Sequence, residues 1–406
     1  MDRSRRGRPV ALWGGTVKRS VRLEVDLDLV GHNYRLVREL LAKGPPARDG
    51  RPPRLAAVLK GNAYGLGALA MAGELLALGA DLLAVACLPE ALELRARFAD
   101  APILVMGHTP TEYLPDCARA GLRTTLFDLD QAQALSRASV ALGVRTPVHV
   151  KIDTGMNRIG IKPDAGTAML IARMADLPGL ALEGIFTQLP YWGPASERAG
   201  FELYQRVVAA AAAAGVAFPL HHVCETLGLT RDLDFRRDMV RIGSLLFGVT
   251  DLPCPPETAG IRLPVALRAR LSRVRPVPAG EGVSYDESWK APAGGARLGT
   301  VPIGYADGYS RRLSNRGQAV VRGRRVPVAG LVSMDQTILD LTTVPEAAEG
   351  DEVLLLGRCG DDQVDLAEIA GWTGMHRLEV LVTIGRRVPR VYFRQGRVAG
   401  EADALA

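Results

Sequence analysis

Short apolar runs alternate with amphipathic stretches between residues 54 and 247 of this 406-residue chain. The runs are rich in Val, Ile and Leu and do not alternate with polar residues, as expected of strands that are buried on both faces. Helix-like segments lie between most of them, such as Ala68–Leu78 and Ser196–Ala214. The pattern predicts eight strands, at Leu55–Leu59, Leu82–Ala86, Pro102–Met106, Leu122–Phe127, Val148–Ile152, Leu182–Thr187, Leu220–Cys224 and Met239–Ile242.

Eight strand–helix units of this kind predict a (β/α)8 TIM barrel, an α/β fold. An open doubly wound sheet is the competing fold. It would need a Gly-rich GxGxxG turn after an early strand, and the sequence has none there. The interval Glu225–Asp238 is short, so a helix before the eighth strand is doubtful.

The pattern changes after Phe247. The stretch Asp251–Gly260 contains three prolines and is typical of a linker. Beyond it, runs with β-strand character are separated by Gly, Pro and Asp, and one helix is expected at Asp365–Gly371. We therefore predict a barrel over residues 21–257 and a smaller, mostly β domain over residues 258–406. The β-type runs are Val265–Val274, Arg297–Ile303, Gln318–Val321, Arg325–Val332, Ile338–Leu341, Glu352–Leu356 and Val388–Phe393.

Composition excludes several classes of protein. Hydrophobic residues make up 48% and charged residues 23% of the chain, which is ordinary for a globular protein. The apolar runs fall short of the roughly 18 residues that span a bilayer, so we expect no membrane helix. The net charge is +6, but residues 1–20 alone hold six bases and one acid. The rest of the chain is nearly neutral and is not expected to bind nucleic acid.

Two features concern the location of the protein. Residues 1–20 lack the apolar segment of a secretory signal, so we expect a disordered basic tail, with a targeting role as the alternative. The five cysteines are scattered and show neither CxxC pairing nor the spacing of a zinc site. This pattern favours a reduced, cytoplasmic compartment and no bound metal.

Catalytic groups of such barrels gather at the carboxyl ends of the strands. Lys60 follows the first strand, where burial would lower the pKa of its amine and prepare it for a Schiff base; a lysine on the barrel rim with its charge in solvent is the alternative. Arg158 follows the fifth strand and could clamp a carboxylate. Gly243 and Ser244 follow the eighth, where phosphate sites often form. A lysine combined with a phosphate site indicates pyridoxal phosphate.

At this point the sequence resembles the alanine racemase family, which belongs to the barrel-type (fold type III) pyridoxal-phosphate enzymes. The segment Ala57–Gly65 is similar to the cofactor-lysine motif of that family. The resemblance runs from about Val21 to Arg394. Further segments that match family motifs are Lys151–Gly160, Asp238–Gly248, Gly282–Trp289, Pro302–Tyr309, Leu331–Gln336 and Val388–Arg390.

The resemblance implies a homodimeric racemase that interconverts L- and D-amino acids, with alanine as the default substrate. Lys60 would bind the cofactor and act as one base, and Tyr285 of the partner subunit would be the other. Racemisation needs a base on each face of Cα, because one group removes a proton and another returns it from the opposite side. Met334 and Asp335 of the partner subunit would approach the same substrate.

The resemblance also implies roles around the cofactor. Arg158 would hold the substrate carboxylate or the phenolic oxygen of the cofactor, and Lys151 matches a position that can be carbamylated and pair with that arginine. Arg241 would face the pyridine nitrogen and keep it unprotonated, which limits side reactions such as transamination. The residues that would hold the phosphate are Tyr64, Gly243 and Ser244.

Three departures from the family pattern concern the cofactor and the substrate pocket. Gln188 stands where a histidine is usual, Glu225-Thr226 stands for Asn-Ser, and Arg386 stands for a tyrosine. Thr226 can still donate its hydroxyl to phosphate, but an ionised Glu225 beside the phenolic oxygen would bring two anions together. Arg386 either contacts the phosphate or recognises a polar or acidic substrate. These changes favour altered specificity, with neutral drift as the alternative.

Two other functions remain open at this point. A decarboxylase or D-amino-acid lyase of the same fold would explain Lys60 and the phosphate site, but not Tyr285 within its motif. A non-catalytic protein that binds pyridoxal phosphate would explain the barrel, but it would not need the second domain.

Overall fold

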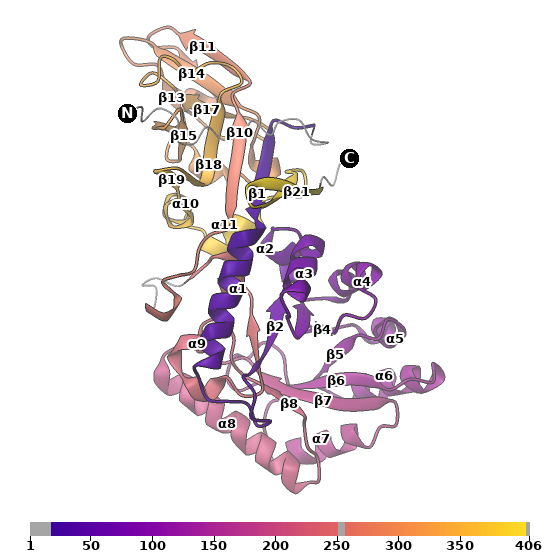
Figure 1. The fold of residues 1–406 in the computed structure, drawn as a ribbon. Coiled ribbons are helices and arrows are strands. Elements are labelled where there is room, and N and C mark those ends of the chain that lie inside the picture. The colour runs from indigo at the N-terminus through magenta and orange to yellow at the C-terminus, as the bar shows by residue number, and fades with distance from the viewer. Residues whose placement is uncertain (1–17, 251–255, 403–406) are drawn as a thin grey trace. The chain divides into compact units, whose positions relative to one another are not determined.

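The computed structural model describes residues 18–250 and 256–402. Most of the expected basic tail, residues 1–17, lies outside the described residues. The described chain divides into two compact units, which are treated separately below (Figure 1). The barrel unit consists of Gly31–Ala63 and Ala68–Ile261, and the β-rich unit consists of residues 18–30, Tyr64–Gly67 and 262–402.

Within the described part of the barrel unit, eight strands form one sheet, and every neighbouring pair in its ladder is parallel. The strand order is β8-β7-β6-β5-β4-β3-β2-β9, so each strand of β2 to β8 lies beside its sequence neighbour, as βαβ units require. Each strand coincides with one predicted apolar run. The strands are β2 (Arg54–Val58), β3 (Leu82–Val85), β4 (Ile103–Val105), β5 (Arg123–Leu126), β6 (Thr146–Ile152), β7 (Leu180–Thr187), β8 (Leu220–His222) and β9 (Met239–Ile242).

The two edge strands, β8 and β9, meet through a few irregular bonds. Glu225 and Arg241 form a parallel bridge, in which the Arg241 N–H donates to the Cys224 carbonyl at 3.0 Å. The Asp238 N–H donates to the His221 carbonyl at 3.1 Å. These bonds join the sheet into a nearly closed barrel, which confirms the predicted fold over the open doubly wound sheet.

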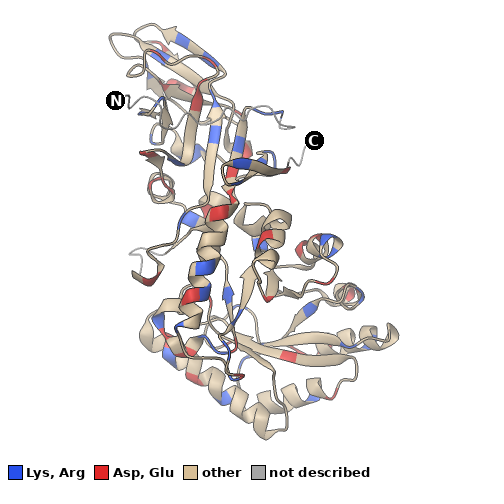
Figure 2. Cartoon of the chain, viewed as in Figure 1, with Lys and Arg blue, Asp and Glu red and all other residues tan. Residues whose placement is uncertain are grey.

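Helices follow most strands of this unit. Helix α8 is Ala-rich, and α6 begins at Asp128, whose carboxylate accepts the Gln131 N–H. The doubtful interval before β9 holds only the single turn α9 and a short 3₁₀ turn at Leu233–Phe235. Acidic and basic residues are interspersed along α1 and α8 (Figure 2). The helices are α1 (Leu27–Ala42), which begins in the β-rich unit, α3 (Ala68–Ala77), α4 (Leu88–Arg97), α5 (Leu114–Arg119), α6 (Leu129–Ala141), α7 (Thr167–Ala175), α8 (Pro194–Ala213) and α9 (Gly228–Arg231).

Strand β1 (Val21–Asp26) belongs to the β-rich unit although it precedes the barrel in the sequence. It pairs antiparallel with β10 (Val265–Arg270) and parallel with β20 (Arg390–Arg394). The expected barrel started at residue 21, and the structure instead places Val21–Val30 in the β-rich unit. The cause is this pairing, which the sequence of a short strand before the first barrel helix does not reveal.

The strands of the β-rich unit form three sheets in its described residues: the main sheet that contains β1, the sheet β11-β14-β17 and the pair β12-β13. The main sheet has the order β16-β15-β18-β10-β1-β20-β21, with β19 paired to β18. The predicted run Val265–Val274 is two strands in different sheets, because the chain turns after β10. Helices α10 (Leu366–Thr373) and α11 (Arg377–Val382) lie near the C-terminus. The other strands are β11 (Arg273–Val277), β12 (Gly282–Val283), β13 (Trp289–Lys290), β14 (Ala296–Val301), β15 (Gln318–Val321), β16 (Arg324–Pro327), β17 (Thr337–Asp340), β18 (Glu352–Cys359), β19 (Asp362–Val364) and β21 (Arg397–Ala402).

A buried carboxylate, Asp307, ties together three loops of the β-rich unit. Arg19 donates to its Oδ1 at 2.7 Å and to the carbonyl of Arg387 at 2.8 Å. Nε of Arg387 lies 3.3 Å from the same Oδ1, and Nη2 of Arg387 lies 2.7 Å from Oδ1 of Asp335. The carbonyl of Asp307 accepts the Gly385 N–H. Arg19, at the edge of the expected tail, is therefore part of the folded core.

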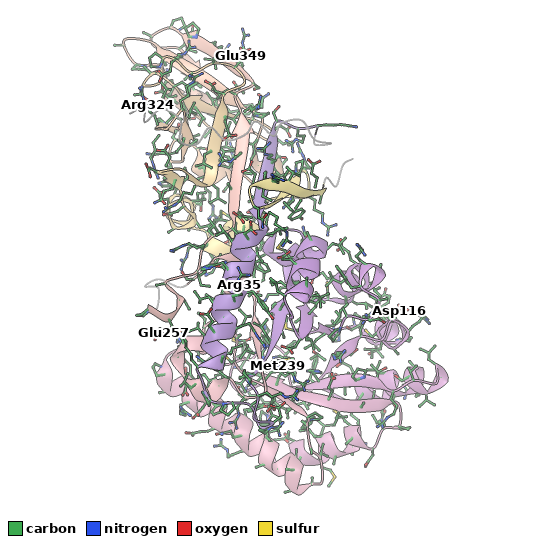
Figure 3. All side chains as sticks on the ribbon, viewed as in Figure 1. Arg35, Asp116, Met239, Glu257, Arg324 and Glu349 are labelled. Atoms are coloured by element: carbon green, nitrogen blue, oxygen red, sulfur yellow. The ribbon has the colours of Figure 1, made fainter. Side chains whose placement is uncertain are left out.

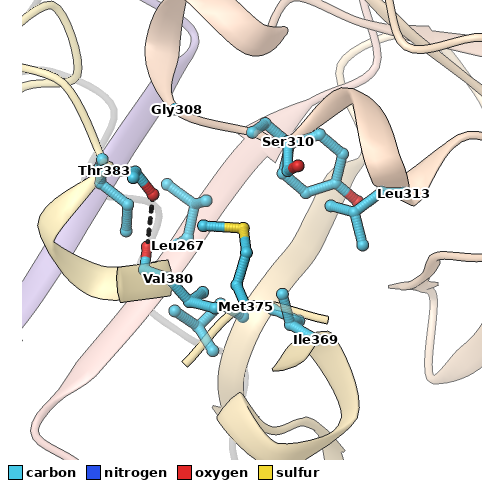
Figure 4. Close-up of a pocket in the computed structure, with 11 residues that line it drawn as sticks. Leu267, Gly308, Ser310, Leu313, Ile369, Met375, Val380 and Thr383 are labelled. Atoms are coloured by element: carbon cyan, nitrogen blue, oxygen red, sulfur yellow. Dashed lines mark hydrogen bonds between the residues drawn. The ribbon is translucent and has the colours of Figure 1, made fainter. Parts of the chain in front are cut away.

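A small apolar cavity of about 20 Å³ lies elsewhere in this unit, lined by residues that include Leu267, Tyr309, Met375 and Thr383 (Figure 4). Its volume is close to that of one water, so it is too small for an amino acid or a cofactor. Among the described residues, none of the helices is both long and apolar enough to cross a membrane.

We expect Arg19→Ala to lower the free energy of unfolding by about 1–3 kcal/mol, because it leaves buried Asp307 with a weaker set of donors. Urea unfolding followed by circular dichroism measures this. The control is Arg397→Ala, since Arg397 is exposed on β21. Equal unfolding midpoints for the two variants would show that Arg19 does not stabilise the unit.

Candidate active site

Lys60 stands at the carboxyl end of β2, at the start of a left-handed turn. Gly61, Asn62, Ala63 and Tyr64 all have φ between 53° and 64°. Each non-glycine residue in this conformation costs roughly 1–2 kcal/mol, and such runs persist only where the surroundings enforce them. Backbone strain is concentrated directly after the residue that the sequence analysis singles out for covalent chemistry.

Two side chains hold this turn in the barrel unit. The Glu90 carboxylate, from α4, accepts the Gly61 N–H at 2.7 Å and the Ala86 N–H at 2.9 Å. It therefore connects the ends of β2 and β3. The Asn62 amide oxygen accepts the Ala68 N–H at 2.8 Å, at the start of α3. These bonds fix the backbone that carries Lys60.

The amine of Lys60 makes no hydrogen bond or ion pair with any described residue. Partial burial lowers its pKa, and the positive charge of Arg158 lowers it further, although Glu225 acts in the opposite direction. A lowered pKa raises the fraction of neutral amine, which is the nucleophilic form. The Lys60 residue is exposed, as a lysine on the barrel rim would be, and its lowered pKa fits the covalent interpretation.

Lys151 and Arg158 flank a tight turn after β6. The Asp153 carboxylate accepts the N–H groups of Gly155 and Asn157 at 3.1 and 3.0 Å. A Cβ on Gly160 would lie 2.7 Å from the Asp153 nitrogen, so only glycine fits there. The turn leaves Arg158 exposed, without an ion pair among the described residues.

Lys151 itself is buried on β6. Its ammonium nitrogen lies 4.5 Å from the centre of the Phe186 ring. Burial, followed by the charges of Arg241 and Arg158, lowers the pKa of Lys151 to about 7. A substantial share of this amine is therefore neutral near pH 7.

Arg241 lies in the barrel interior on β9 and is bound mainly by backbone carbonyls. Its guanidinium donates to the carbonyls of His222 at 2.7 Å, Thr187 at 2.9 Å and Val223 at 3.3 Å. It also reaches the Gln188 side-chain oxygen, at 3.5 Å. Gln188 thus contacts Arg241 from the end of β7.

A chain of hydrogen bonds continues from Arg241 across the barrel. Arg241 lies 3.1 Å from His222 Nδ1, His222 Nε2 lies 2.7 Å from His149 Nδ1, and His149 Nε2 lies 3.0 Å from Glu183. A guanidinium only donates, so Nδ1 of His222 must accept, and the protons of both imidazoles are assigned to Nε2. Burial lowers the pKa of both histidines, which agrees with two neutral rings.

The chain ends on an ion pair at the other side of the barrel. Glu183 receives two hydrogen bonds from Arg123, at 2.7 and 3.0 Å. Burial alone would raise the pKa of Glu183, but the hydrogen bonds from His149 and Arg123 outweigh it and lower the pKa to about 2. The ionised carboxylate therefore fixes the far end of the chain.

Glu225 follows β8 and is half-buried. Its Oε1 accepts the N–H groups of Leu227 and Gly228, at 2.9 and 3.3 Å, so this oxygen stabilises its own turn. Burial raises the pKa of Glu225, and the two backbone donors offset this only in part. The raised pKa shifts Glu225 towards its protonated form, which lacks the repulsion between two anions that an ionised carboxylate would cause.

The remaining predicted residues of the barrel unit lie at the same end of the strands. Thr226 follows Glu225, and Gly243 and Ser244 follow β9, where Ser244 begins a 3₁₀ turn. Residues 18–250 and 256–402 contain no cluster of three or more His, Cys, Asp or Glu that could hold a metal ion.

The other predicted residues belong to the β-rich unit. Tyr285 is 66% exposed between β12 and β13, and three neighbours, Ser284, Asp286 and Glu287, have positive φ. A hydrophobic cluster that includes Val283 packs beneath this loop. Met334 is exposed in the turn that also holds Asp335, and the Ala306 N–H donates to the Met334 carbonyl at 3.0 Å.

Arg386 and Tyr64 complete this second group. Arg386 is exposed between α11 and β20, beside Gly385. Tyr64 is buried in the short segment that follows Lys60. The structure thus brings nine of the predicted residues to one end of the barrel and five to the β-rich unit.

Sequence reasoning missed Glu90, Glu183 and the two histidines. A signal for His149 was present, because it precedes Lys151 by two positions on β6 and alternate residues of a strand share a face. Glu90 gave no such signal, since its role depends on where α4 places it against the Lys60 turn.

The charges of the barrel site suit an anionic cofactor and substrate. Burial and the charges of Arg158 and Arg241 lower the pKa values of Lys60 and Lys151, and the charge of Glu225 opposes this at Lys60. A phosphate group and a carboxylate would neutralise this excess of positive charge. The residues present therefore fit pyridoxal phosphate bound through Lys60.

Sequence comparisons agree with this assignment. The model of the alanine racemase N-terminal domain matches residues 25–251, and that of the C-terminal domain matches residues 265–392. Alanine racemase from Desulfovibrio desulfuricans is 39% identical over 377 residues, 92% of this chain and 98% of the relative. That from Symbiobacterium thermophilum is 38% identical, over 91% and 96%.

Solved structures give the same result. Alanine racemase of Clostridium difficile 630 superposes with a TM-score of 0.88 at 30% identity, covering 96% of this chain and all of the other. The enzyme from Bacillus anthracis, solved with bound L-Ala-P, has a TM-score of 0.88 at 29% identity, covering 96% and 99%. The chain belongs to the alanine racemase family and is a pyridoxal-phosphate-dependent amino-acid racemase.

Proposed function

We propose that Lys60 and Tyr285 are the two bases of the racemase and that Tyr285 of the partner subunit completes each site. The observation that carries this is the amine of Lys60, which has a lowered pKa and no competing partner at the head of a strained, anchored turn. Tyr285 supports the pairing because it is exposed on a loop that a packed cluster holds in place.

Pyridoxal phosphate, when bound, withdraws electrons from Cα and makes its hydrogen acidic. Lys60 then removes or returns the proton on one face, and Tyr285 does so on the other. Arg158 binds the substrate carboxylate, or the phenolic oxygen of the cofactor, through its unpaired guanidinium. Met334 and Asp335 contact the substrate, and the Arg387–Asp335 pair holds their turn.

Arg241 keeps the ring nitrogen of the cofactor unprotonated, because a guanidinium has no proton to give near neutral pH. The hydrogen-bond chain through His222 and His149 holds it in place. Tyr64, Thr226, Gly243 and Ser244 hold the phosphate, and Gln188 and Glu225 border the cofactor.

Lys151 is proposed to be carbamylated. Carbon dioxide reacts with a neutral amine, and the pKa of about 7 keeps part of Lys151 neutral. The product carries a negative charge, which would pair with Arg158 and reduce the excess of positive charge at this site.

Assembly and location are also proposed. A homodimer follows from assigning Tyr285 to the partner subunit. Cytoplasmic location is supported by Cys87, Cys117 and Cys224, which are free thiols. The amino acid is proposed to be alanine unless Arg386 faces the substrate side chain, in which case polar or acidic substrates are favoured.

We expect Lys60→Ala to abolish both racemisation and the visible absorbance of the lysine-bound cofactor. Borohydride reduction of the wild-type enzyme, followed by peptide mass spectrometry, should place the cofactor on Lys60. Cofactor trapped on a different lysine would refute the assignment.

Tyr285→Phe should slow the exchange of the Cα proton of L-alanine in deuterated water more than that of D-alanine, as measured by NMR. Co-refolding this variant with Lys60→Ala should restore about a quarter of wild-type activity, because half of the dimers are hybrids with one intact site each. Equal loss with both enantiomers would contradict the two-base arrangement, and a failure to complement would contradict the shared site.

Glu225→Gln should change how stability depends on pH. The folded pKa of Glu225 is raised, so its contribution is fully present below the unfolded pKa of about 4.3 and is lost as pH rises through the folded pKa. The variant should therefore gain stability relative to wild type from pH 5 to pH 8, in urea unfolding of the cofactor-free protein. Glu202→Gln, an exposed site on α8, should show no such trend. If the stability of Glu225→Gln and that of wild type changed with pH in parallel, Glu225 would be ionised in the folded protein.

Arg386→Tyr separates the two interpretations of that arginine. If Arg386 binds phosphate, cofactor affinity falls, measured by fluorescence titration, and the ranking of substrates stays the same. If Arg386 faces the substrate, activity on alanine rises relative to larger polar amino acids. Weaker cofactor binding with an unchanged ranking would rule out the specificity role.

A further inference from the structure

A second cleft lies within the barrel unit, at the opposite ends of the strands from Lys60. It has a volume of about 410 Å³ and is bordered by the second half of α8, the start of β8 and the residues before β9. Met239, labelled in Figure 3, begins β9 directly after Arg237 and Asp238 in the lining. Residues 46–48, from the segment between α1 and β2, form another part of the wall. The active-site residues follow the carboxyl ends of these strands, so this cleft is a separate site.

Most charges in this cleft are already compensated. Arg48 binds Asp238 through two nitrogens, with Nε 3.0 Å from Oδ1 and Nη2 2.6 Å from Oδ2. Burial alone would raise the pKa of Asp238, but the hydrogen bonds from Arg48 lower it, so the carboxylate is ionised and paired. Burial and the charge of Arg48 lower the pKa of His221 to about 4, so this ring is neutral near pH 7.

Arg237 is the exception. Its guanidinium makes no hydrogen bond or ion pair with any described residue, and its carbon lies 5.1 Å from the centre of the Phe201 ring. Its backbone is also in the left-handed region, with φ of 46°, which is unfavourable for a long side chain. The fold therefore holds Arg237 in a strained conformation that leaves its N–H donors without acceptors at the cleft.

One part of the α8 wall is apolar, although Tyr204 and Gln205 of the same helix also line the cleft. Val208, Ala209 and Ala212 of α8 form this part. A guanidinium presents a planar fork that matches the oxygens of a carboxylate or phosphate, and the apolar wall can cover a short hydrocarbon chain. The occupant that satisfies both parts carries an oxyanion at one end and a few carbons at the other.

We propose that this cleft binds a small organic oxyanion, with Arg237 as the ligand of its oxygen atoms and the α8 wall in contact with its apolar part. This site is independent of the racemase mechanism proposed above.

Calorimetric titration of the holoenzyme with acetate, propionate and butyrate tests the proposal, and propyl phosphate serves as the phosphate arm. Binding should tighten about threefold with each added methylene, because the α8 wall buries it. Arg237→Gln should weaken butyrate or propyl phosphate at least tenfold. The matched control, Arg206→Gln, changes an exposed arginine of α8 and should leave both affinities unchanged.

The active site also binds anions, so two further variants distinguish the sites. Arg158→Gln should leave this binding unchanged. Val208→Asp places a negative charge on the apolar wall without altering Arg237 and should abolish it. Equal affinities in wild type and Arg237→Gln, or a loss of binding in Arg158→Gln alone, would overturn the proposal.

Discussion

Burial of one guanidinium in the barrel determines much of the arrangement around it. Arg241 has five N–H donors and accepts no hydrogen bond, so every group that faces it must be an acceptor. Three backbone carbonyls at the ends of β7 and β8 meet that need. Because Arg241 only donates, His222 must accept its hydrogen bond, which sets the tautomer of His222. The hydrogen bond from His222 then sets the tautomer of His149, which donates to the ionised Glu183. The Arg241 side chain is thereby fixed by a hydrogen-bond network whose members all have partners.

Positive charge at the carboxyl ends of the strands explains the chemistry of the two lysines. Desolvation, followed by the charges of Arg158 and Arg241, lowers the pKa of both amines, although Lys151 is buried and Lys60 is exposed. The same cations attract the anionic groups of the cofactor and substrate. Burial raises the pKa of Glu225 and so shifts it towards the neutral acid, and one of its oxygens supports its own turn. The substitution of an amide by this carboxyl group is therefore compatible with a working racemase.

The sequence could predict the barrel because its strands are buried on both faces and lie beside their sequence neighbours. Lys60 and Arg158 could be found because they follow strand ends, and Lys151 was found through the resemblance to the family. The position of β1 could not be predicted, because its partners lie more than 200 residues away and the sequence of the strand does not identify them. Glu90 and the histidine chain depend on side chains that meet only in the folded barrel. The ion pair between Arg19 and Asp307 could not be predicted, because Arg19 lies in a segment with the composition of a tail.

The placement of β1 has a consequence for synthesis of the chain. The barrel unit, Gly31–Ala63 and Ala68–Ile261, can complete its contacts while the ribosome is still adding the later residues. Strand β1 cannot, because one neighbour is β10 and the other is β20, which ends at Arg394. At about 5–20 residues per second, β1 waits roughly 20–70 s for its second partner. During that time β1, in which Val21, Leu23 and Val25 alternate with charged residues, has open edges that can pair with another chain.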